Sequence, residues 1–378
     1  MAQSPILIAG AGIGGLTAAI ALRRAGFDAH VYERAAEIRE VGAGITLQAN
    51  AMLALRTIGL DAVVTAAGRV ATKASLQTAA GKILSRIDLQ GVEREMGAPA
   101  VAIHRATLQE LLVSALGREF LHLDGQVAGY EARQDGVTVR LADGRRLEGA
   151  LLIGADGIRS AVRSQLLGDG EPLYAGYVAW RGVAEPERAP EEVSESWGRG
   201  RRFGIVPIEN GRVYWFATLN APAGGRDEPG TVRRRLEDLF AGWHPPIAEM
   251  LAATPERAIL RNDMLHRLPA GRWGEGRVTL LGDAAHPMTP NLGQGACQAI
   301  EDAVALAGCL RDASGDPVAA LRRYEALRIP RANGFVRASL RLGRVAQSEN
   351  VVVCRLRNAL VSLVPSSISR RQLVRTLR

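Results

Sequence analysis

Residues 5–34 read PILIAGAGIGGLTAAIALRRAGFDAHVYER, and this stretch decides the fold. An apolar run over residues 5–10 predicts a buried strand, and DAHVYER at residues 28–34 predicts a second one. Between them, apolar side chains recur at helical spacing up to Gly26, a residue type that commonly ends helices; they are Leu16, Ala19, Ile20 and Leu22. Strand, helix and strand within about 30 residues form a right-handed βαβ unit. The fold class is therefore α/β.

The turn of this unit carries the pattern GxGxxG, formed by Gly10, Gly12 and Gly14, with Gly15 following. The first glycine permits the tight turn, the second lets a pyrophosphate approach the backbone, and the third allows close helix packing. Glu33 follows Gly15 by 18 residues, where its carboxylate can bind a ribose diol, and Arg34 comes next. The pattern fits NAD or the ADP half of FAD. A glycine turn without a ligand is the alternative.

Two further glycine-acid motifs follow strand-like runs. GADGIRSAVR occupies residues 154–163 and contains Asp156, and GDAAHP occupies residues 282–287 and contains Asp283. An aspartate directly after a buried strand, ahead of a helix start at residues 293–295, places an acceptor for sugar hydroxyls beside free backbone N–H donors. Asp283 as a helix N-cap is the alternative. A simple dehydrogenase has no need of these motifs.

The composition is that of a folded globular protein. The chain has 378 residues, of which 47% are hydrophobic and 23% charged, which favours two domains and argues against disorder. The 47 basic residues exceed the 39 acidic ones, but acids interrupt the arginines almost throughout, so we expect no nucleic-acid partner. No apolar run reaches the roughly 20 residues of a transmembrane helix. The three cysteines and the absence of a leader pattern favour a cytoplasmic location.

The predicted elements divide the chain into parts. Residues 105–118 predict an amphipathic helix, and a β-meander with Asp-Gly turns at 135–136 and 143–144 follows it. Residues 174–272 carry strand-like pieces and four of the five tryptophans, whereas the chain after residue 316 is helical and breaks at Pro365. We therefore expect a discontinuous Rossmann-like domain, an inserted sheet-rich domain and a helical tail. Their residues are 1–72 with 98–173 and 272–345, then 73–97 with 174–271, and then 346–378.

The three motifs, in this order and at these separations, resemble the FAD-dependent aromatic hydroxylases of the para-hydroxybenzoate hydroxylase type, nearest the urate and salicylate hydroxylase branch. The resemblance covers nearly the whole chain. It implies that the first motif binds the ADP part of FAD, that the Asp156 motif serves FAD and the nicotinamide coenzyme, and that Asp283 holds the ribityl and ribose region. It also implies that Arg105 contacts the flavin and that the backbone of Val127 reaches adenine. The cofactor set further includes Gly44, Gly293, Gly295 and Ala296.

The resemblance also implies a reaction. NADH or NADPH reduces FAD, the reduced flavin captures O2 as a C4a-hydroperoxide, and a hydroxyl group is transferred to an electron-rich aromatic or heteroaromatic carbon. Because the sequence holds one GxGxxG motif, we expect no separate nicotinamide domain, and the hydride donor would approach the flavin transiently. We expect a monomer or a homodimer. The cofactor performs the hard chemistry, while the protein excludes water and orients the substrate.

Residues 201–207 and 212–216 predict two antiparallel strands joined by a turn at residues 209–211. Strand alternation puts Arg202, Gly204 and Val206 on one face, and Tyr214 can share it. An arginine and a phenol on an apolar wall would orient an anionic or carbonyl-bearing ring. With residues 174–180 they resemble the urate hydroxylase branch, so the predicted catalytic residues are Arg202, Tyr214 and Pro290. A surface arginine on an edge strand is the alternative.

Other functions stay open at this point. A flavin-dependent hydroxylase or epoxidase of a lipophilic substrate is the first, because the basic tail over residues 351–378 could form a membrane-facing amphipathic surface, although a packed terminal helix explains it too. An NAD-dependent dehydrogenase and a non-enzymatic nucleotide-binding scaffold are the others. No histidine pair stands at metal-ligand spacing, so we expect no metal. We expect His286 to pack or to support neighbouring site residues, and not to act in catalysis, since the chemistry needs no histidine base.

Overall fold

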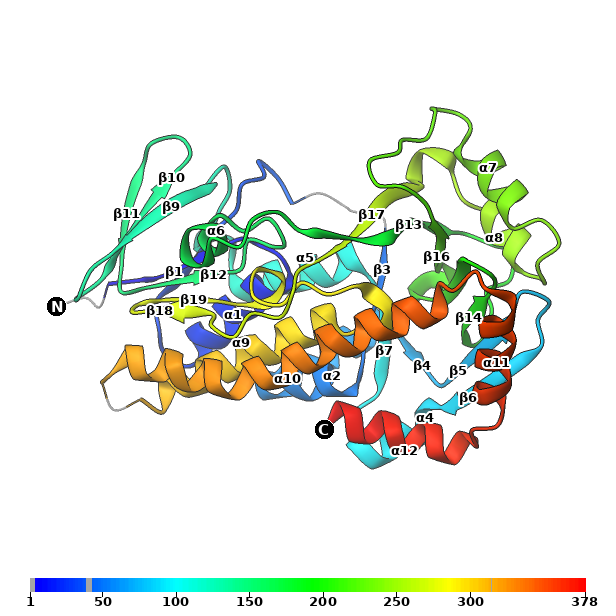
Figure 1. Cartoon of the computed structure of the whole chain (residues 1–378). Helices are drawn as coiled ribbons and strands as arrows, with labels where there is room; N and C mark the ends of the chain where they lie inside the picture. Colours follow the sequence, from blue (N-terminus) through cyan, green and yellow to red (C-terminus); the bar gives the residue numbers. More distant parts are fainter. Residues whose placement is uncertain (1–3, 39–42, 314) are drawn as a thin grey trace.

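The computed structural model describes residues 4–38, 43–313 and 315–378. Its largest sheets are a six-stranded sheet built around the N-terminal βαβ unit and a seven-stranded sheet at the other end of the molecule (Figure 1). The expected fold class is confirmed: an α/β fold with a Rossmann-like unit, a second sheet-rich region and C-terminal helices. The division of the chain into domains at the residues given above stays a prediction.

The six-stranded sheet has the order β18-β19-β12-β1-β2-β8, and all neighbours except β18 and β19 are parallel. Every residue of β1, and every residue of β12, is buried, as expected for parallel strands covered on both faces. The predicted strand, helix and strand are confirmed as β1, α1 and β2. The bounds are Gly274–Glu275 (β18), Val278–Leu280 (β19), Leu151–Gly154 (β12), Ile6–Ala9 (β1), Ala29–Tyr32 (β2), Leu121–His122 (β8) and Ile13–Arg24 (α1).

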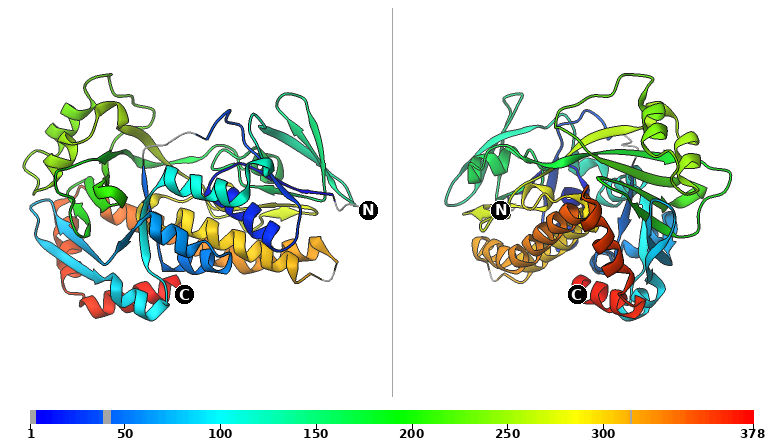
Figure 2. Two further views of the ribbon diagram at one scale, coloured as in Figure 1. Left: turned by 180° about the vertical axis from the view of Figure 1, so that it is seen from behind. Right: turned by 45° about the vertical axis from the view of Figure 1, so that its right-hand side comes forward.

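Helices and two small sheets surround the six-stranded sheet. Helix α9 packs against α1, α2 and α10, and the views of Figure 2 show α9 and α10 running side by side. The predicted β-meander is confirmed as β9, β10 and β11, and β3 and β4 pair on either side of β7. The helices are Ala49–Thr57 (α2), Asp61–Ala67 (α3), Leu89–Met96 (α4), Arg105–Leu116 (α5), Ala161–Leu167 (α6), Gly295–Arg311 (α9) and Pro317–Ala346 (α10). The strands are Gly44–Leu47 (β3), Arg69–Ala71 (β4), Ala100–His104 (β7), Val127–Ala132 (β9), Val137–Leu141 (β10) and Arg146–Gly149 (β11).

The seven-stranded sheet has the order β17-β13-β16-β15-β14-β5-β6. One face packs against α7 and α8 through a core that includes Trp180, Phe203 and Trp215. The opposite face carries Arg181, Arg202 and Tyr214. The strands are Lys73–Thr78 (β5), Ile83–Asp88 (β6), Leu173–Ala184 (β13), Val193–Trp197 (β14), Arg201–Pro207 (β15), Val213–Asn220 (β16) and Leu260–His266 (β17), and the helices are Val232–Leu239 (α7) and Ile247–Ala252 (α8).

The chain ends in two short helices, Val351–Ser362 (α11) and Ser366–Leu377 (α12), separated at Pro365 as predicted. Helix α11 lies beside β6, and α12 lies beside β6 and α4, at the lower right of Figure 1. Taken singly, none of the helices in the described ranges has the length and apolarity needed to cross a membrane. Helices α11 and α12 meet those criteria only as a pair, and the pair is bent by 94°.

Candidate cofactor and substrate site

The carboxyl ends of the parallel strands bring the three motifs together. Strand β1 leads into Gly10, β12 into Asp156, and β19 into Asp283, and these strands are neighbours in the sheet. The loops touch through the backbone, because Ala155 N donates to Ala9 O at 2.8 Å and Leu281 N donates to Gly154 O at 2.9 Å. The topology therefore assembles segments that are more than 100 residues apart into one edge, where ligands of open α/β sheets bind.

The glycine turn has the geometry that a dinucleotide requires. Gly10 has a φ of +99°, and a Cβ there would lie 2.5 Å from Ala155 O, so only glycine fits. At Gly14 a Cβ would lie 2.8 Å from the Leu281 side chain. Gly12, in contrast, has no heavy atom of the described chain within 4 Å of its ideal Cβ. The open side of the turn is thus the one over Gly12, at the start of α1, where the helix dipole favours phosphate.

Glu33 directly follows β2 and holds the glycine turn through hydrogen bonds to its carboxylate. Its Oε2 accepts from Ala11 N at 2.8 Å and its Oε1 accepts from Ala35 N at 3.0 Å, which leaves lone pairs for further donors. Arg34, the next residue, is exposed. Glu33 therefore both fixes the glycine turn and presents a carboxylate beside it.

Asp156 and Arg163 hold the second motif against the third. Asp156 Oδ2 accepts from Ala161 N at 2.7 Å, at the start of α6, whereas Asp156 Oδ1 is buried without a partner in the described chain. Burial raises the pKa of Asp156. The buried Arg163 guanidinium donates through Nη1 to Ala284 O at 2.9 Å and to Ala285 O at 2.7 Å. The arginine of the GADGIRSAVR stretch thereby fixes the loop that carries Asp283.

Asp283, Arg105 and Tyr214 converge where the two large sheets meet. Burial raises the pKa of Asp283, an effect opposed by His286 and Arg105. Burial lowers the pKa of Arg105, and the charge of Asp283 opposes that shift. The Asp283 and Arg105 residues are exposed to solvent, although neighbouring protein atoms desolvate both side chains in part. Across the described residues no hydrogen bond engages the side-chain polar atoms of these three residues, so they are available to a ligand.

Asp283 does not cap a helix. It lies in the short 3-10 turn Gly282–Ala284, and the N-cap of α9 is Gln294. Within the described chain no side chain caps α9, and a Cβ at Gly295 would lie 3.9 Å from Asp283 Oδ1. The carboxylate therefore stands beside free N–H groups at the start of α9, next to Ala296. The N-cap alternative is wrong, because β19 ends too far ahead of α9.

A buried ionic network supports this loop, and sequence reasoning missed it. Asp302 Oδ2 accepts from Gly282 N at 3.1 Å and lies 2.6 Å from His286 Nε2, while its Oδ1 accepts from Arg328 Nε at 2.6 Å. Burial alone would raise the pKa of Asp302, but His286 and Arg328 lower it to about 2. Arg328 also contacts Glu301 at 2.5 Å. His286 is buried against Trp273, consistent with a packing assignment.

Arg202 is placed differently from the expectation. The register pairs Arg202 with Thr218 and Val206 with Tyr214, so the predicted shared face is confirmed. The guanidinium, however, is only 3% exposed. Its Nε donates to Gln347 Oε1 at 2.7 Å, its Nη1 to Glu195 Oε1 at 3.0 Å, and its Nη2 to Asn291 Oδ1 at 2.7 Å. The alternative of a surface arginine on an edge strand is wrong, because β15 is an inner strand.

Arg181 is the arginine near Tyr214 that keeps a free donor. It lies on β13, directly opposite Phe216 of β16, and donates to Asn262 Oδ1 at 2.6 Å. Its Nε is buried without a partner among the described residues. Burial raises the pKa of Tyr214, and the charges of Arg181 and Arg105 oppose the shift. An unpaired buried donor beside a phenol marks the site better than the saturated Arg202, and strand alternation alone could have suggested it.

The remaining predicted residues lie around this junction or farther out. A Cβ at Gly44 would lie 2.4 Å from Tyr214 Cβ, so β3 and β16 approach each other only with glycine here. Pro290 is exposed in the 3-10 turn Pro290–Leu292, which Gly293 ends with a φ of +61°. Val127 is buried at the start of β9. Gly44 and Pro290 thus belong to the junction of the two sheets.

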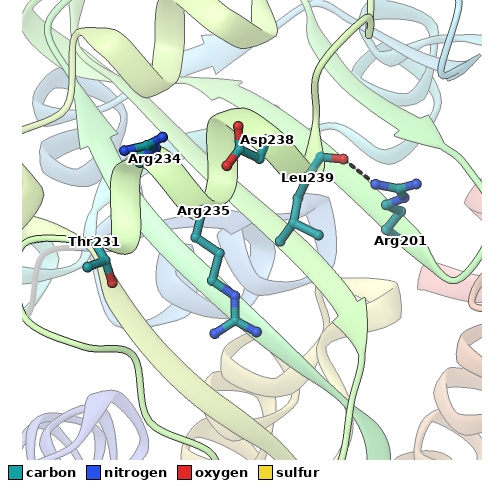
Figure 3. Close-up of a pocket in the computed structure, with 6 residues that line it drawn as sticks. All are labelled: Arg201, Thr231, Arg234, Arg235, Asp238 and Leu239. Atoms are coloured by element: carbon teal, nitrogen blue, oxygen red, sulfur yellow. Dashed lines mark hydrogen bonds between the residues drawn. The ribbon is translucent and has the colours of Figure 1, made fainter.

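A surface hollow of about 410 Å³ lies on the other side of the seven-stranded sheet (Figure 3). Arg235 pairs there with Asp227 at 2.5 Å and Arg201 donates to Leu239 O, so two of its cations are engaged. The hollow is lined by Arg201, Thr231, Arg234, Arg235, Asp238 and Leu239. Over the three described ranges, no group of three acidic, histidine or cysteine side chains could hold a metal.

Comparisons with known proteins identify the family of the chain. A family model described as FAD binding domain matches residues 3–339. The chain is 49% identical over 363 residues to the aurachin C monooxygenase/isomerase of Stigmatella aurantiaca, covering 96% of this chain and 94% of that protein. It is 38% identical to the chloroplastic zeaxanthin epoxidase of Solanum lycopersicum, covering 91% of this chain and 54% of the epoxidase, so the chain spans about half of that relative.

A solved structure agrees as well. The crystal structure of Klebsiella pneumoniae HpxO complexed with FAD and uric acid superimposes with a TM-score of 0.93 at 32% identity, covering 99% of this chain and 96% of that one. Fold, motif geometry and relatives together define an FAD-dependent monooxygenase. The chain belongs to the family of class A FAD-dependent aromatic hydroxylases.

Proposed function

We propose that this monooxygenase uses NADH or NADPH and O2 to hydroxylate an electron-rich aromatic or heteroaromatic small molecule. The reaction would take place between the start of α9 and the face of the seven-stranded sheet that carries Arg181, Arg202 and Tyr214, which we call the substrate face. The observation that carries the proposal is the convergence of Asp283, Arg105 and Tyr214. Their side-chain polar atoms lack hydrogen-bond partners across the described residues. Asp283 follows β19 of the six-stranded sheet, Arg105 begins α5, and Tyr214 lies on β16 of the seven-stranded sheet. Polar groups that converge without protein partners are typical of a binding site.

The residues present fit FAD. The open backbone over Gly12 and the start of α1 would receive the pyrophosphate, and Glu33 the adenosine ribose. Asp283 and the uncapped start of α9 would receive the ribityl hydroxyls and the flavin ring. When bound, FAD supplies hydride acceptance and O2 activation. The guanidinium of Arg105 would add a positive charge to this site, close to Asp283.

The substrate face offers one cation and one phenol on a largely apolar wall. Arg181 and Phe216 stand opposite each other, and Tyr214 lies two residues along β16. A ring bearing a carbonyl or an anionic oxygen could accept from Arg181 Nε while stacking against aromatic side chains. Arg202 would act indirectly, by holding Asn291 in the loop that begins at Pro290.

A lipophilic substrate is the second candidate. It is favoured by the 49% identity to an aurachin C monooxygenase/isomerase and by the match to zeaxanthin epoxidase. Aurachin C and zeaxanthin therefore belong in the panel of test compounds, beside phenols, purines and quinolones. Under this candidate the same cofactor residues apply, and only the compound that stimulates NAD(P)H oxidation differs.

The first experiment is spectroscopic. The purified protein should be yellow and should release FAD, not FMN or NAD, on denaturation. NADH and NADPH oxidation is then measured across the panel, with hydroxylated product and hydrogen peroxide both quantified. A colourless protein, or NAD(P)H oxidation that no compound stimulates, would contradict the proposal and favour the dehydrogenase or scaffold alternatives.

The second experiment uses variants of the substrate face. Arg181→Ala and Tyr214→Phe should retain FAD but lower substrate-stimulated NAD(P)H oxidation about tenfold, since each removes a hydrogen bond of about 1–2 kcal/mol. Arg188→Ala is the matched control, because Arg188 is exposed in the same half of the chain. If both variants keep the KM and product yield of the wild type with a substrate identified by the first experiment, the substrate does not bind at Arg181 and Tyr214.

A further inference from the structure

Helix α11 and the start of α12 expose several large apolar side chains. Leu356 is 59% exposed, Leu360 66% and Leu363 76%. We define the tail surface as the exposed apolar side chains Val352, Val353, Leu356, Leu360, Leu363 and Ile368. A contiguous apolar patch on a globular protein marks an interaction site, and scattered single exposures do not.

The tail is held on the protein by its other side. Cys354 and Arg357 of α11 are buried, and Arg357 Nη1 donates to Ala346 O at 2.9 Å. In α12, Val374 and Leu377 are buried, and Arg370 pairs with Glu95 at 2.9 Å. Figure 1 shows both helices against the end of the molecule that contains β6. The open face of α11 is therefore the one that the fold leaves uncovered.

The charge of the tail has a single sign. Residues 351–378 contain six arginines and no acidic residue. Arg355, Arg371 and Arg375 are exposed, and so are Arg341 and Arg344 at the end of α10. Apolar side chains beside unpaired arginines on short helices match the surface of an anionic bilayer. They do not match a second copy of the same surface, because a two-fold interface would bring these like charges together.

The helices are too short to cross a bilayer. Each has 12 residues, which is about 18 Å at the α-helical rise, against about 30 Å of hydrocarbon. The pair is bent by 94°, and α12 is anchored by Val374 and Leu377. We propose that α11 lies in the plane of an anionic membrane, with the tail surface inserted among the acyl chains and the arginines at the lipid headgroups. The inference is independent of the reaction and extends beyond the proposed function.

Vesicle sedimentation of the full chain with FAD bound tests this proposal. The protein should pellet with vesicles in which about a third of the lipid is phosphatidylglycerol, pellet less with phosphatidylcholine alone, and dissociate as salt is raised. Leu356→Asp with Leu360→Asp should lower the partition coefficient about tenfold or more. Arg355→Gln and Arg371→Gln should each lower it about fivefold for the phosphatidylglycerol vesicles.

Leu327→Asp is the matched control. Leu327 has the same 59% exposure as Leu356 but lies about 29 Å before the end of α10. FAD content and far-UV circular dichroism verify that each variant is folded. Failure of the wild-type chain to bind anionic vesicles would overturn the proposal, as would an equal loss in Leu327→Asp. A concentration-dependent dimer that Leu360→Asp dissociates, without vesicle binding, would assign the tail surface to a second copy instead.

Discussion

Asp283 is a carboxylate on which no hydrogen bond of the described chain ends, and it stands beside the uncapped start of α9. We expect Asp283→Ala to weaken FAD binding at least tenfold, because a hydrogen bond to a charged group contributes about 1.5–3 kcal/mol. Flavin content after extensive dialysis measures the effect. Asp135→Asn, in the exposed turn between β9 and β10, is the control. Full retention of FAD by Asp283→Ala would remove this residue from the cofactor site.

Arg202 is expected to act through stability and positioning. Arg202→Ala removes one of two donors from each of Glu195, Gln347 and Asn291 and the charge that faces Glu195, and we expect it to lower the free energy of unfolding by about 3 kcal/mol. Urea unfolding of the FAD-bound protein measures this loss. With the true substrate, the share of NADH or NADPH lost to hydrogen peroxide should rise, because Asn291 loses its hydrogen bond to Arg202. Wild-type stability and peroxide yield would contradict both parts.

Among the elements, the contact between α9 and α10 carries the buried pair Asp302 and Arg328. The ordinary pKa of an aspartate is 3.8, and that of Asp302 is about 2, so its stabilisation is complete above about pH 4 and lost as the pH falls toward 2. Asp302→Asn should lower the free energy of unfolding by about 3–5 kcal/mol at neutral pH and flatten its acid dependence. Urea unfolding between pH 7 and about 3 measures both.

The control for this variant is Asp312→Asn. Asp312 follows α9 and is 54% exposed in its pair with Arg311. An exposed pair contributes little, so the control should keep the stability and the acid dependence of the wild type. If Asp302→Asn loses stability with the same slope in acid as the wild type, the acid sensitivity arises from other carboxyl groups.

Local patterns were enough to predict the βαβ unit, the meander and the three motifs, because strand, turn and helix preferences of residues 5–34 or 127–149 depend on neighbours in the chain. They could not predict the contacts that complete the site. Arg202 meets Gln347 across 145 residues, and Asp302 meets Arg328 across 26 with no motif to mark either. Alternation correctly put Arg202 on the substrate face, but its saturation by distant partners follows only from tertiary packing.

At the scale of the whole molecule, FAD would join loops from neighbouring strands of one sheet to the substrate face. A ligand that binds only the folded state stabilises it by mass action, by about 2.7 kcal/mol at a hundredfold excess over Kd. We therefore expect the apoprotein to melt several degrees below the FAD-bound protein, and Tm to rise with FAD concentration. Differential scanning fluorimetry with FAD, FMN and NAD measures this. An equal response to NAD would favour the dehydrogenase alternative.

The contacts of Gln347 determine what removal of the residues after Ala346 would do to the protein. It lies four residues before α11, and besides accepting from Arg202 it accepts from Thr218 Oγ1 at 2.9 Å and donates to Asn220 Oδ1 at 2.9 Å. Gln347 thus joins the segment that precedes α11 to β15 and β16 of the seven-stranded sheet. A chain that ends at residue 346 would lack Gln347 and would leave the buried Arg202 without one of its acceptors. Loss of activity in such a chain would therefore report a disturbed substrate face, and not a role of α11 and α12 in the reaction.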